Sequence, residues 1–170
     1  MPRFLASLLY LLSIQAPPQE GTCFPGDHQS MSPTGPRIIY QWAGELHHLF
    51  FESARQDTPV RLLTFERSAC VHWSPRGDFF ALTNYAGSNI SVVEIVSSED
   101  LSRRVRISDV LPPAAKALSS DPRYRYSEGI SWDSAGLVVR VHGESRSEAR
   151  EFDLRVLCTF ESPRWSCSMP

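Results

Sequence analysis

Proline and glycine interrupt this chain often enough to exclude long helices. Its 170 residues include thirteen prolines and nine glycines, which leave only short segments between them. Proline inside a helix removes a backbone hydrogen bond and clashes with the preceding turn. Between the interruptions lie runs rich in β-branched and aromatic residues, for example Ile38–Trp42 and Ile90–Val96, and such runs are typical of β-strands. The sequence therefore predicts an all-β fold built from short antiparallel strands.

Apolar and polar side chains alternate most regularly near the end of the chain. Apolar side chains occupy every second position over residues 152–160, and the positions between them are charged or polar except at Leu157. Successive side chains of a strand point to opposite faces of a sheet. This stretch therefore predicts a strand with one buried face and one face in solvent. The predicted buried face consists of Phe152, Leu154, Val156, Cys158 and Phe160.

One short helix is predicted over Pro113–Leu118, where two successive prolines precede an alanine-rich stretch. Proline suits the first turn of a helix because the amide hydrogen that it lacks would be unpaired there. The residues that follow, up to Glu128, show no strand pattern, and we expect them to form a long loop between strands. Long loops on a rigid β scaffold often carry binding residues.

The first residues resemble an export signal. Arg3 is followed by an apolar run from Phe4 to Ala16, which is shorter than the roughly 20 residues that cross a bilayer. A positive residue before a short apolar run is typical of a secretory signal peptide. Cleavage after Ala16 is acceptable, although Pro17 would hinder it, and a site nearer residues 21–22 is the alternative. The protein is therefore expected in the periplasm or outside the cell, with no membrane span.

These observations predict three parts of the chain. Residues 1–21 are expected to be the signal peptide. Residues 22–36 are rich in proline, glycine and serine, which predicts a linker or an ordered coil. Residues 37–170 are expected to form the all-β domain. No later segment is apolar enough to span a membrane.

The four cysteines fit an exported protein with disulfide bonds. They allow three pairings, and the sequence alone does not choose between them. Cys158 lies on the predicted apolar face and could pair across the core, while Cys23 and Cys167 flank the domain and could tie its ends together. No two cysteines have the Cys-x-x-Cys spacing of a zinc site. The disulfide candidates are Cys23, Cys70, Cys158 and Cys167.

Two segments form a weak internal repeat. Val71–Asp78 and Ile130–Leu137 each carry tryptophan and glycine at the same spacing, with an apolar residue two positions before the tryptophan. Each would form a strand, a tight turn and a second strand. We expect the tryptophans to pack under the turns, and Gly77 and Gly136 to supply the positive φ that such turns need.

The repeated pattern resembles the inner hairpin of a β-propeller blade of the WD-repeat or TolB-like kind. The second copy departs from that pattern, because it has Asp133-Ser134-Ala135 where Ser-Pro-x is usual. A blade takes about 40–50 residues and a propeller needs at least four blades, whereas roughly 150 residues follow the leader. The resemblance therefore implies antiparallel blade-like sheets with one short helix, arranged as a β-sandwich or a partial propeller. It implies no particular activity.

The sequence offers little catalytic chemistry. It contains no Gly-x-Ser-x-Gly elbow and no phosphate-binding glycine loop. Glu45, His47, His48 and Glu52 invite a metal site, but on a strand they divide two to each face. Lys and Arg number 17 against 19 Asp and Glu, which does not fit a nucleic-acid binder. We therefore expect no metal, no other cofactor and no nucleic-acid partner.

The favoured interpretation is an exported, non-enzymatic protein that binds another protein through its loops, as a periplasmic inhibitor, an immunity-type protein or an envelope factor. Tyrosine and arginine are enriched at interface hot spots. One alternative is a hydrolase with a loop-borne site that uses His47 or His72 with Asp78. Another is a structural subunit that oligomerises to complete a sheet. The predicted binding residues are Arg123, Tyr124, Arg125 and Tyr126.

Overall fold

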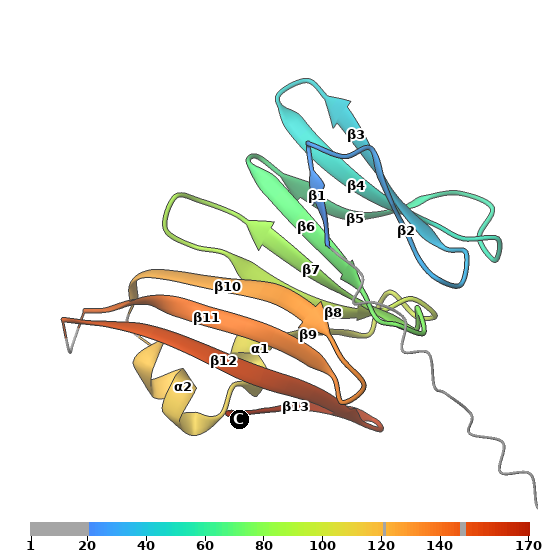
Figure 1. The fold of residues 1–170 in the computed structure, drawn as a ribbon. Helices are drawn as coiled ribbons and strands as arrows, with labels where there is room; N and C mark the ends of the chain where they lie inside the picture. Colours follow the sequence, from blue (N-terminus) through green and yellow to red (C-terminus); the bar gives the residue numbers. More distant parts are fainter. Residues whose placement is uncertain (1–20, 121, 147–148) are drawn as a thin grey trace, which may run out of the picture.

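The computed structural model describes residues 21–120, 122–146 and 149–170. The predicted signal peptide lies outside these residues except for Gly21. The described residues form three antiparallel sheets and two short helices (Figure 1). The predicted all-β class with antiparallel sheets is confirmed. Within the described residues, no helix combines the length and the apolar character needed to cross a membrane.

The first sheet is a meander of four consecutive strands. Its strands, in spatial order, are β2 (Gln29–Met31), β3 (Arg37–Ala43), β4 (Leu46–Glu52) and β5 (Val60–Phe65). The second sheet begins with a strand that precedes the first sheet in the chain and continues as another meander. Its order is β1 (Thr22–Phe24), β6 (Ser68–Trp73), β7 (Phe79–Tyr85), β8 (Val92–Ser97) and β9 (Arg104–Arg106).

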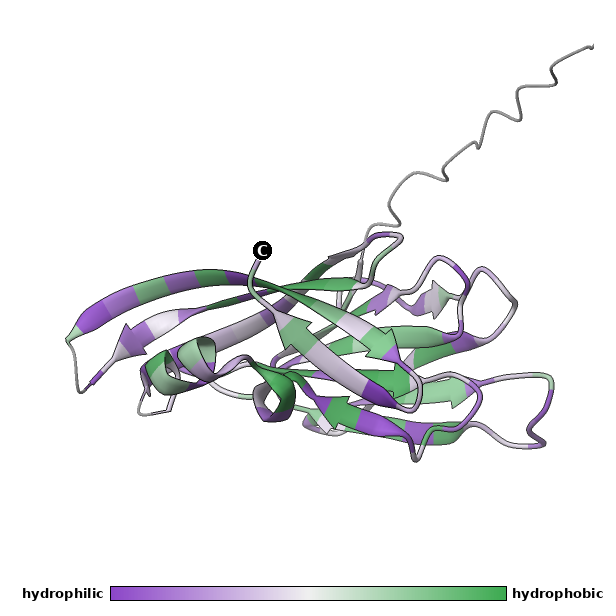
Figure 2. Ribbon diagram, turned by 90° about the horizontal axis from the view of Figure 1, so that it is seen from below, coloured by the Kyte–Doolittle hydropathy of each residue, from purple (hydrophilic) through white to green (hydrophobic). Residues whose placement is uncertain are grey.

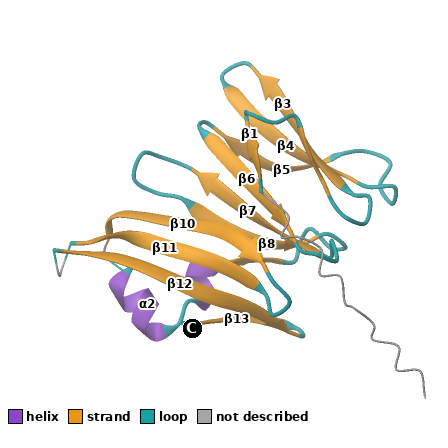
Figure 3. Cartoon of the chain, viewed as in Figure 1, coloured by secondary structure: helices purple, strands orange, loops and turns teal. Residues whose placement is uncertain are grey.

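The third sheet follows the helices and is again a four-stranded meander. Its strands are β10 (Pro122–Trp132), β11 (Leu137–Ser145), β12 (Arg150–Glu161) and β13 (Arg164–Ser168). Two helices, α1 (Ile107–Val110) and α2 (Pro113–Leu118), connect it to the second sheet (Figure 3). The predicted helix is α2. The prediction of a single helix is wrong, because α1 is one turn of four residues and too short for a periodic pattern.

The three sheets lie one after another as successive layers, coloured cyan, green and orange in Figure 1. One core fills the space between the first and second sheets and contains Phe51, Trp73 and Phe80. A second core lies between the second and third sheets, and residues of both helices, such as Ile107 and Ala115, join it. The hydrophobic residues follow the strands in the middle of the molecule, whereas the loops are mostly hydrophilic (Figure 2).

The internal repeat forms two hairpins, β6–β7 and β10–β11. Trp73 is only 2% exposed and donates to Oγ of Ser30 at 3.0 Å. Gly77 has a φ of 69°, as predicted. The prediction is wrong for Gly136, which has no positive φ. A Cβ atom at this position would lie 2.1 Å from the carbonyl oxygen of Cys158, so close approach of two backbones requires glycine there.

The disulfides are Cys23–Cys70 and Cys158–Cys167. Each joins residues directly opposite each other on neighbouring antiparallel strands, with Cα atoms 4.1 and 4.0 Å apart. The expectations that Cys158 pairs across the core and that Cys23 pairs with Cys167 are therefore wrong. β1 pairs with β6, and β13 pairs with β12. Each cysteine therefore lies directly opposite its disulfide partner on the neighbouring strand.

Two segments differ from their expected local structure. Residues 22–36, expected to be a linker or coil, contain β1 and β2 and so belong to two sheets. Each of these strands has only three residues, too few to show alternation. The residues after α2, expected to form a loop, instead form most of β10. The alternation predicted over residues 152–160 is present in β12, where Phe152, Val156 and Cys158 are buried.

Candidate functional site

The predicted binding residues Arg123, Tyr124, Arg125 and Tyr126 lie on β10, an edge strand of the third sheet. Their placement in a loop is therefore wrong. The structure also divides them between environments. Tyr124 and Tyr126 lie on the face of the third sheet opposite to its buried side chains Val139 and Val141. Arg125 turns toward α2, where its guanidinium donates to the carbonyl oxygen of Ser119 at 3.2 Å.

Side chains of three adjacent strands form a continuous surface around the two tyrosines. On this surface Tyr126 stands opposite His142, which stands opposite Asp153, and Glu128 stands opposite Arg140 in the next row. Alternation along β10, β11 and β12 turns all of them to the same side. We call this surface the third-sheet face and define it as Tyr124, Tyr126, Glu128, Arg140, His142 and Asp153.

The aromatic part of the third-sheet face is held in a fixed arrangement. The ring of Tyr126 stacks on the imidazole of His142, with centroids 5.2 Å apart and planes inclined by 26°. The ring of Tyr124 lies 6.1 Å from that of Tyr126. The Tyr126 hydroxyl donates to the carbonyl oxygen of Ser88 in the β7–β8 loop. Both ends of the Tyr126 side chain therefore have contacts that restrict its rotation.

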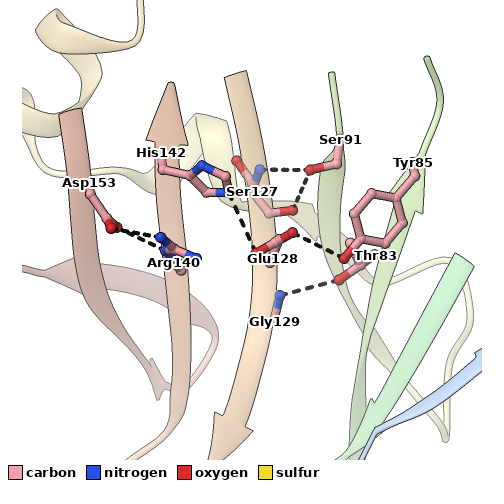
Figure 4. Close-up of polar contacts among 9 residues, drawn as sticks. All are labelled: Thr83, Tyr85, Ser91, Ser127, Glu128, Gly129, Arg140, His142 and Asp153. Atoms are coloured by element: carbon pink, nitrogen blue, oxygen red, sulfur yellow. Dashed lines mark hydrogen bonds and ion pairs between the residues drawn. The ribbon is translucent and has the colours of Figure 1, made fainter. Parts of the chain in front are cut away.

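The polar contacts of the charged part fall into two separate groups, Arg140 with Asp153 and Glu128 with His142 and Tyr85 (Figure 4). Arg140 donates to both carboxylate oxygens of Asp153, at 2.9 and 2.7 Å. Nε2 of His142 lies 3.5 Å from a carboxylate oxygen of Glu128. The other oxygen of Glu128 accepts from the hydroxyl of Tyr85 at 3.2 Å. Because Tyr85 belongs to β7, Glu128 connects the second sheet with the third.

Among the ionisable groups in these contacts, Tyr85 and Asp153 have shifted pKa values. Burial, followed by the negative charge of Glu128, raises the pKa of Tyr85 to about 12. The phenol therefore remains a hydrogen-bond donor at neutral pH. The hydrogen bonds from Arg140 lower the pKa of Asp153, which keeps this carboxyl ionised. Both shifts favour the protonation states that the observed contacts need.

The edge of β10 that does not pair with β11 forms hydrogen bonds with residues of the second sheet and its β7–β8 loop. Oγ of Ser91 donates to the carbonyl oxygen of Ser127 and accepts from its amide, both at 2.8 Å. The amide of Gly129 donates to Oγ1 of Thr83 at 3.2 Å. Nearer the start of the strand, Arg125 forms a bridge with Ile90. These contacts satisfy backbone groups that an edge strand would otherwise leave open, and they fix the position of the third-sheet face.

The residues considered for catalysis lie apart from one another. His47 stacks on Phe65, with centroids 5.1 Å apart, and Nδ1 of His47 pairs with the Tyr40 hydroxyl at 2.7 Å. Asp78 accepts from the Ser74 hydroxyl at 2.7 Å inside the β6–β7 turn. His72 lies at a third place, against Gly129. Among the described residues, no hydrogen bond or ion pair connects His47, His72 and Asp78.

The residues considered for metal binding also lie on two different faces of their strand. His48 is bound to Oγ1 of Thr64 at 3.0 Å, on the face of β4 opposite to His47. In the part of the chain that the structure describes, no group of three or more His, Cys, Asp or Glu side chains could hold a metal ion.

Several residues of the third-sheet face were missed because they come from other strands. Arg140, His142 and Asp153 could have been found by extending the alternation of β12 to its neighbour β11. Tyr85 could not have been found in this way, because its contact with Glu128 depends on how two sheets pack.

No model of a known protein family matches this chain, and no curated protein and no solved structure matches it either. The third-sheet face combines stacked aromatic rings with mutually paired charges. Such a surface suits recognition, because its side chains are already ordered before a partner arrives.

Proposed function

We propose that this chain is an exported, non-enzymatic protein that binds another protein through the third-sheet face. The observation that carries the proposal is the group Tyr124, Tyr126 and His142, ordered on an accessible sheet surface. Aromatic side chains contribute large contact areas, and tyrosine is enriched among residues that dominate binding energy. Because Tyr126 is already held by His142 and Ser88, little side-chain entropy would be lost on binding.

The disulfides support the export part of the proposal. Both Cys23–Cys70 and Cys158–Cys167 are formed, and such bonds persist in oxidising compartments such as the periplasm or the cell exterior. An inhibitor, an immunity-type protein or an envelope factor would act there by covering a surface of its partner. The third-sheet face requires no catalytic group for such a role.

The experiment is capture of partners from an envelope extract on the immobilised, oxidised protein, followed by titration of each purified partner. We expect the Tyr124→Ala/Tyr126→Ala double variant to bind at least about tenfold more weakly than the wild type, as for loss of a hot spot. Trp42→Ala is the control, because Trp42 is 72% exposed and lies on the first sheet.

Equal affinity of the double variant and the wild type would overturn the assignment of the surface. Capture of no protein above background would overturn the binding function itself. Circular dichroism of each variant confirms that the loss of binding does not come from unfolding.

A further inference from the structure

A second feature, the turn-end cleft, lies where the two repeated hairpins turn. Its volume is about 430 Å³. One wall is the β6–β7 turn and the other is the β10–β11 turn, so the two copies of the internal repeat face each other across it. Its floor is aromatic and comes from Phe79, Trp132, Phe160 and Trp165. Polar side chains, among them Ser74, Asp133 and Ser134, line it beside the aromatic rings, and a concave site that combines aromatic surface with polar groups can hold a ligand.

The aromatic rings of the floor are inclined to one another. Phe79 meets Trp165 edge to face, with centroids 5.2 Å apart and planes at 84°. Trp132 and Trp165 are 6.1 Å apart at 69°. All four rings of the floor are only partly buried. The indole nitrogen of Trp132 already donates to the carbonyl oxygen of His72 at 2.8 Å, so this residue offers the cleft its ring rather than a hydrogen bond.

The charges of the turn-end cleft favour a positive ligand. Arg76, Asp78 and Asp133 line it and Arg103 lies over Phe160 of its floor, so these four charges balance. Asp78 pairs with Arg76, whereas Asp133 has no ion pair among the described residues, and its carboxylate can therefore attract a cation. Oδ1 of Asp133 accepts from the amides of Ala135 and Gly136 at 2.7 and 2.9 Å. Arg76 pairs with Asp78 at 3.0 Å, but its side chain is 86% exposed. An exposed pair of this kind holds its members weakly, so Arg76 can move aside.

The floor already attracts one cation from the chain itself. The guanidinium carbon of Arg103 lies 5.8 Å from the ring centroid of Phe160. The faces of aromatic rings carry partial negative charge, and this attracts ammonium and guanidinium groups.

We infer that the turn-end cleft binds an organic cation, either the alkylammonium group of a small molecule or the guanidinium of an arginine in another chain. The cation would lie over the aromatic floor and near the carboxylate of Asp133. This site is separate from the third-sheet face, so the two can be tested independently.

The test follows the indole N–H signals of Trp132 and Trp165 by NMR during titration. Choline represents the small molecule, and N-acetyl-arginine methylamide represents an arginine of another chain. Their neutral isosteres are 3,3-dimethylbutan-1-ol and N-acetyl-citrulline methylamide. We expect at least one cation to shift both signals saturably, while Trp42 and Trp73 do not shift and the isosteres have little effect. The cation that binds more tightly identifies the source.

Two surface variants test the electrostatic part of the inference in opposite directions. Asp133→Asn keeps an acceptor for the turn amides but loses the charge, so it should weaken cation binding about threefold. Arg76→Ala removes a competing charge and should strengthen it about twofold. Asp27→Asn is the matched control, because the carboxylate of Asp27 also accepts from a backbone amide, that of Cys23, outside the cleft.

Trp165→Ala removes part of the floor and should abolish saturable shifts of Trp132. If this variant does not fold, the two surface variants still decide the matter. Equal binding of cations and neutral isosteres would overturn the inference. So would unchanged affinity in both Asp133→Asn and Arg76→Ala, or no saturable shift at about 50 mM cation, well above millimolar dissociation constants.

Discussion

Tyr85 shows how one side chain joins two sheets. Its hydroxyl donates to Glu128 across the boundary between the second and third sheets, and its pKa is raised to about 12. A raised folded-state pKa means that the folded protein keeps the proton more strongly than the unfolded chain. This contribution to stability is therefore fully present below pH 10, the ordinary tyrosine value, and disappears as the pH rises to about 12.

Replacing Tyr85 by phenylalanine removes the donor but keeps the ring. We expect the free energy of unfolding at pH 7 to fall by about 1 kcal/mol, the typical net value of a hydrogen bond, as measured by urea denaturation. A titration of tyrosinate absorbance should lose its most alkaline component in this variant. Retention of that component would show that another tyrosine has the raised pKa.

His72 is the residue with the opposite behaviour. Burial lowers the pKa of its imidazole, and Nδ1 has no hydrogen-bond partner within the described residues. The folded protein therefore holds His72 neutral, whereas the unfolded chain takes up a proton near the ordinary value of 6.5. Stability is fully present above pH 6.5 and decreases as the pH falls from 6.5 toward the folded-state pKa.

The His72→Gln variant should lose this part of the pH dependence. One group contributes at most about 1.4 kcal/mol per pH unit to the slope of the unfolding free energy. We expect the wild type to be steeper than the variant between pH 6.5 and the folded-state pKa, as measured by urea denaturation at several pH values. Parallel profiles of the two proteins would contradict the assignment.

Among the elements, β10 shows where sequence patterns stop being informative. This strand does not have one apolar side and one polar side. Ser127 and Gly129 contact the second sheet by hydrogen bonds and not by apolar packing. A strand with polar residues on its packed side has the amino-acid composition of a loop, and for this reason the sequence pattern predicted a loop here. By contrast, β12 was predictable because its buried face packs against apolar side chains, and α2 because its prolines mark a helix start.

The attachment of β10 can be tested at Ser91, a residue that is only 1% exposed. Ser91→Ala leaves two backbone groups of Ser127 without their partner and should cost about 1–3 kcal/mol of unfolding free energy. It should also speed hydrogen exchange of the Ser127 amide. Ser91→Thr retains the hydroxyl and should lose less. Ser88→Ala, at an exposed position of the same loop, should behave like the wild type.

At the scale of the whole molecule, the two disulfides close loops of very different length. Cys23–Cys70 spans 47 residues and encloses the entire first sheet, whereas Cys158–Cys167 spans 9. The pairing was not predictable, because it depends on which strands become neighbours rather than on cysteine spacing. Chain length and the repeated hairpins predicted blade-like antiparallel sheets. They did not predict that three such sheets would stack.

Loop length predicts unequal contributions to stability. Chain entropy gives about 4 kcal/mol for the long loop and about 2.6 kcal/mol for the short one. We therefore expect Cys23→Ala/Cys70→Ala to lower the unfolding free energy more than Cys158→Ala/Cys167→Ala, as measured by urea denaturation of each double variant. The reverse order would show that local packing outweighs chain entropy.

The position of β1 also determines the order in which the chain can fold. Among the described strands β1 is synthesised first, yet its partner β6 is made only after the whole first sheet. The first sheet has only local pairings and can assemble as soon as β5 emerges, since short connections close quickly. Oxidation of Cys23 with Cys70 must wait for β6. Formation of this bond therefore reports that the second sheet has begun to form.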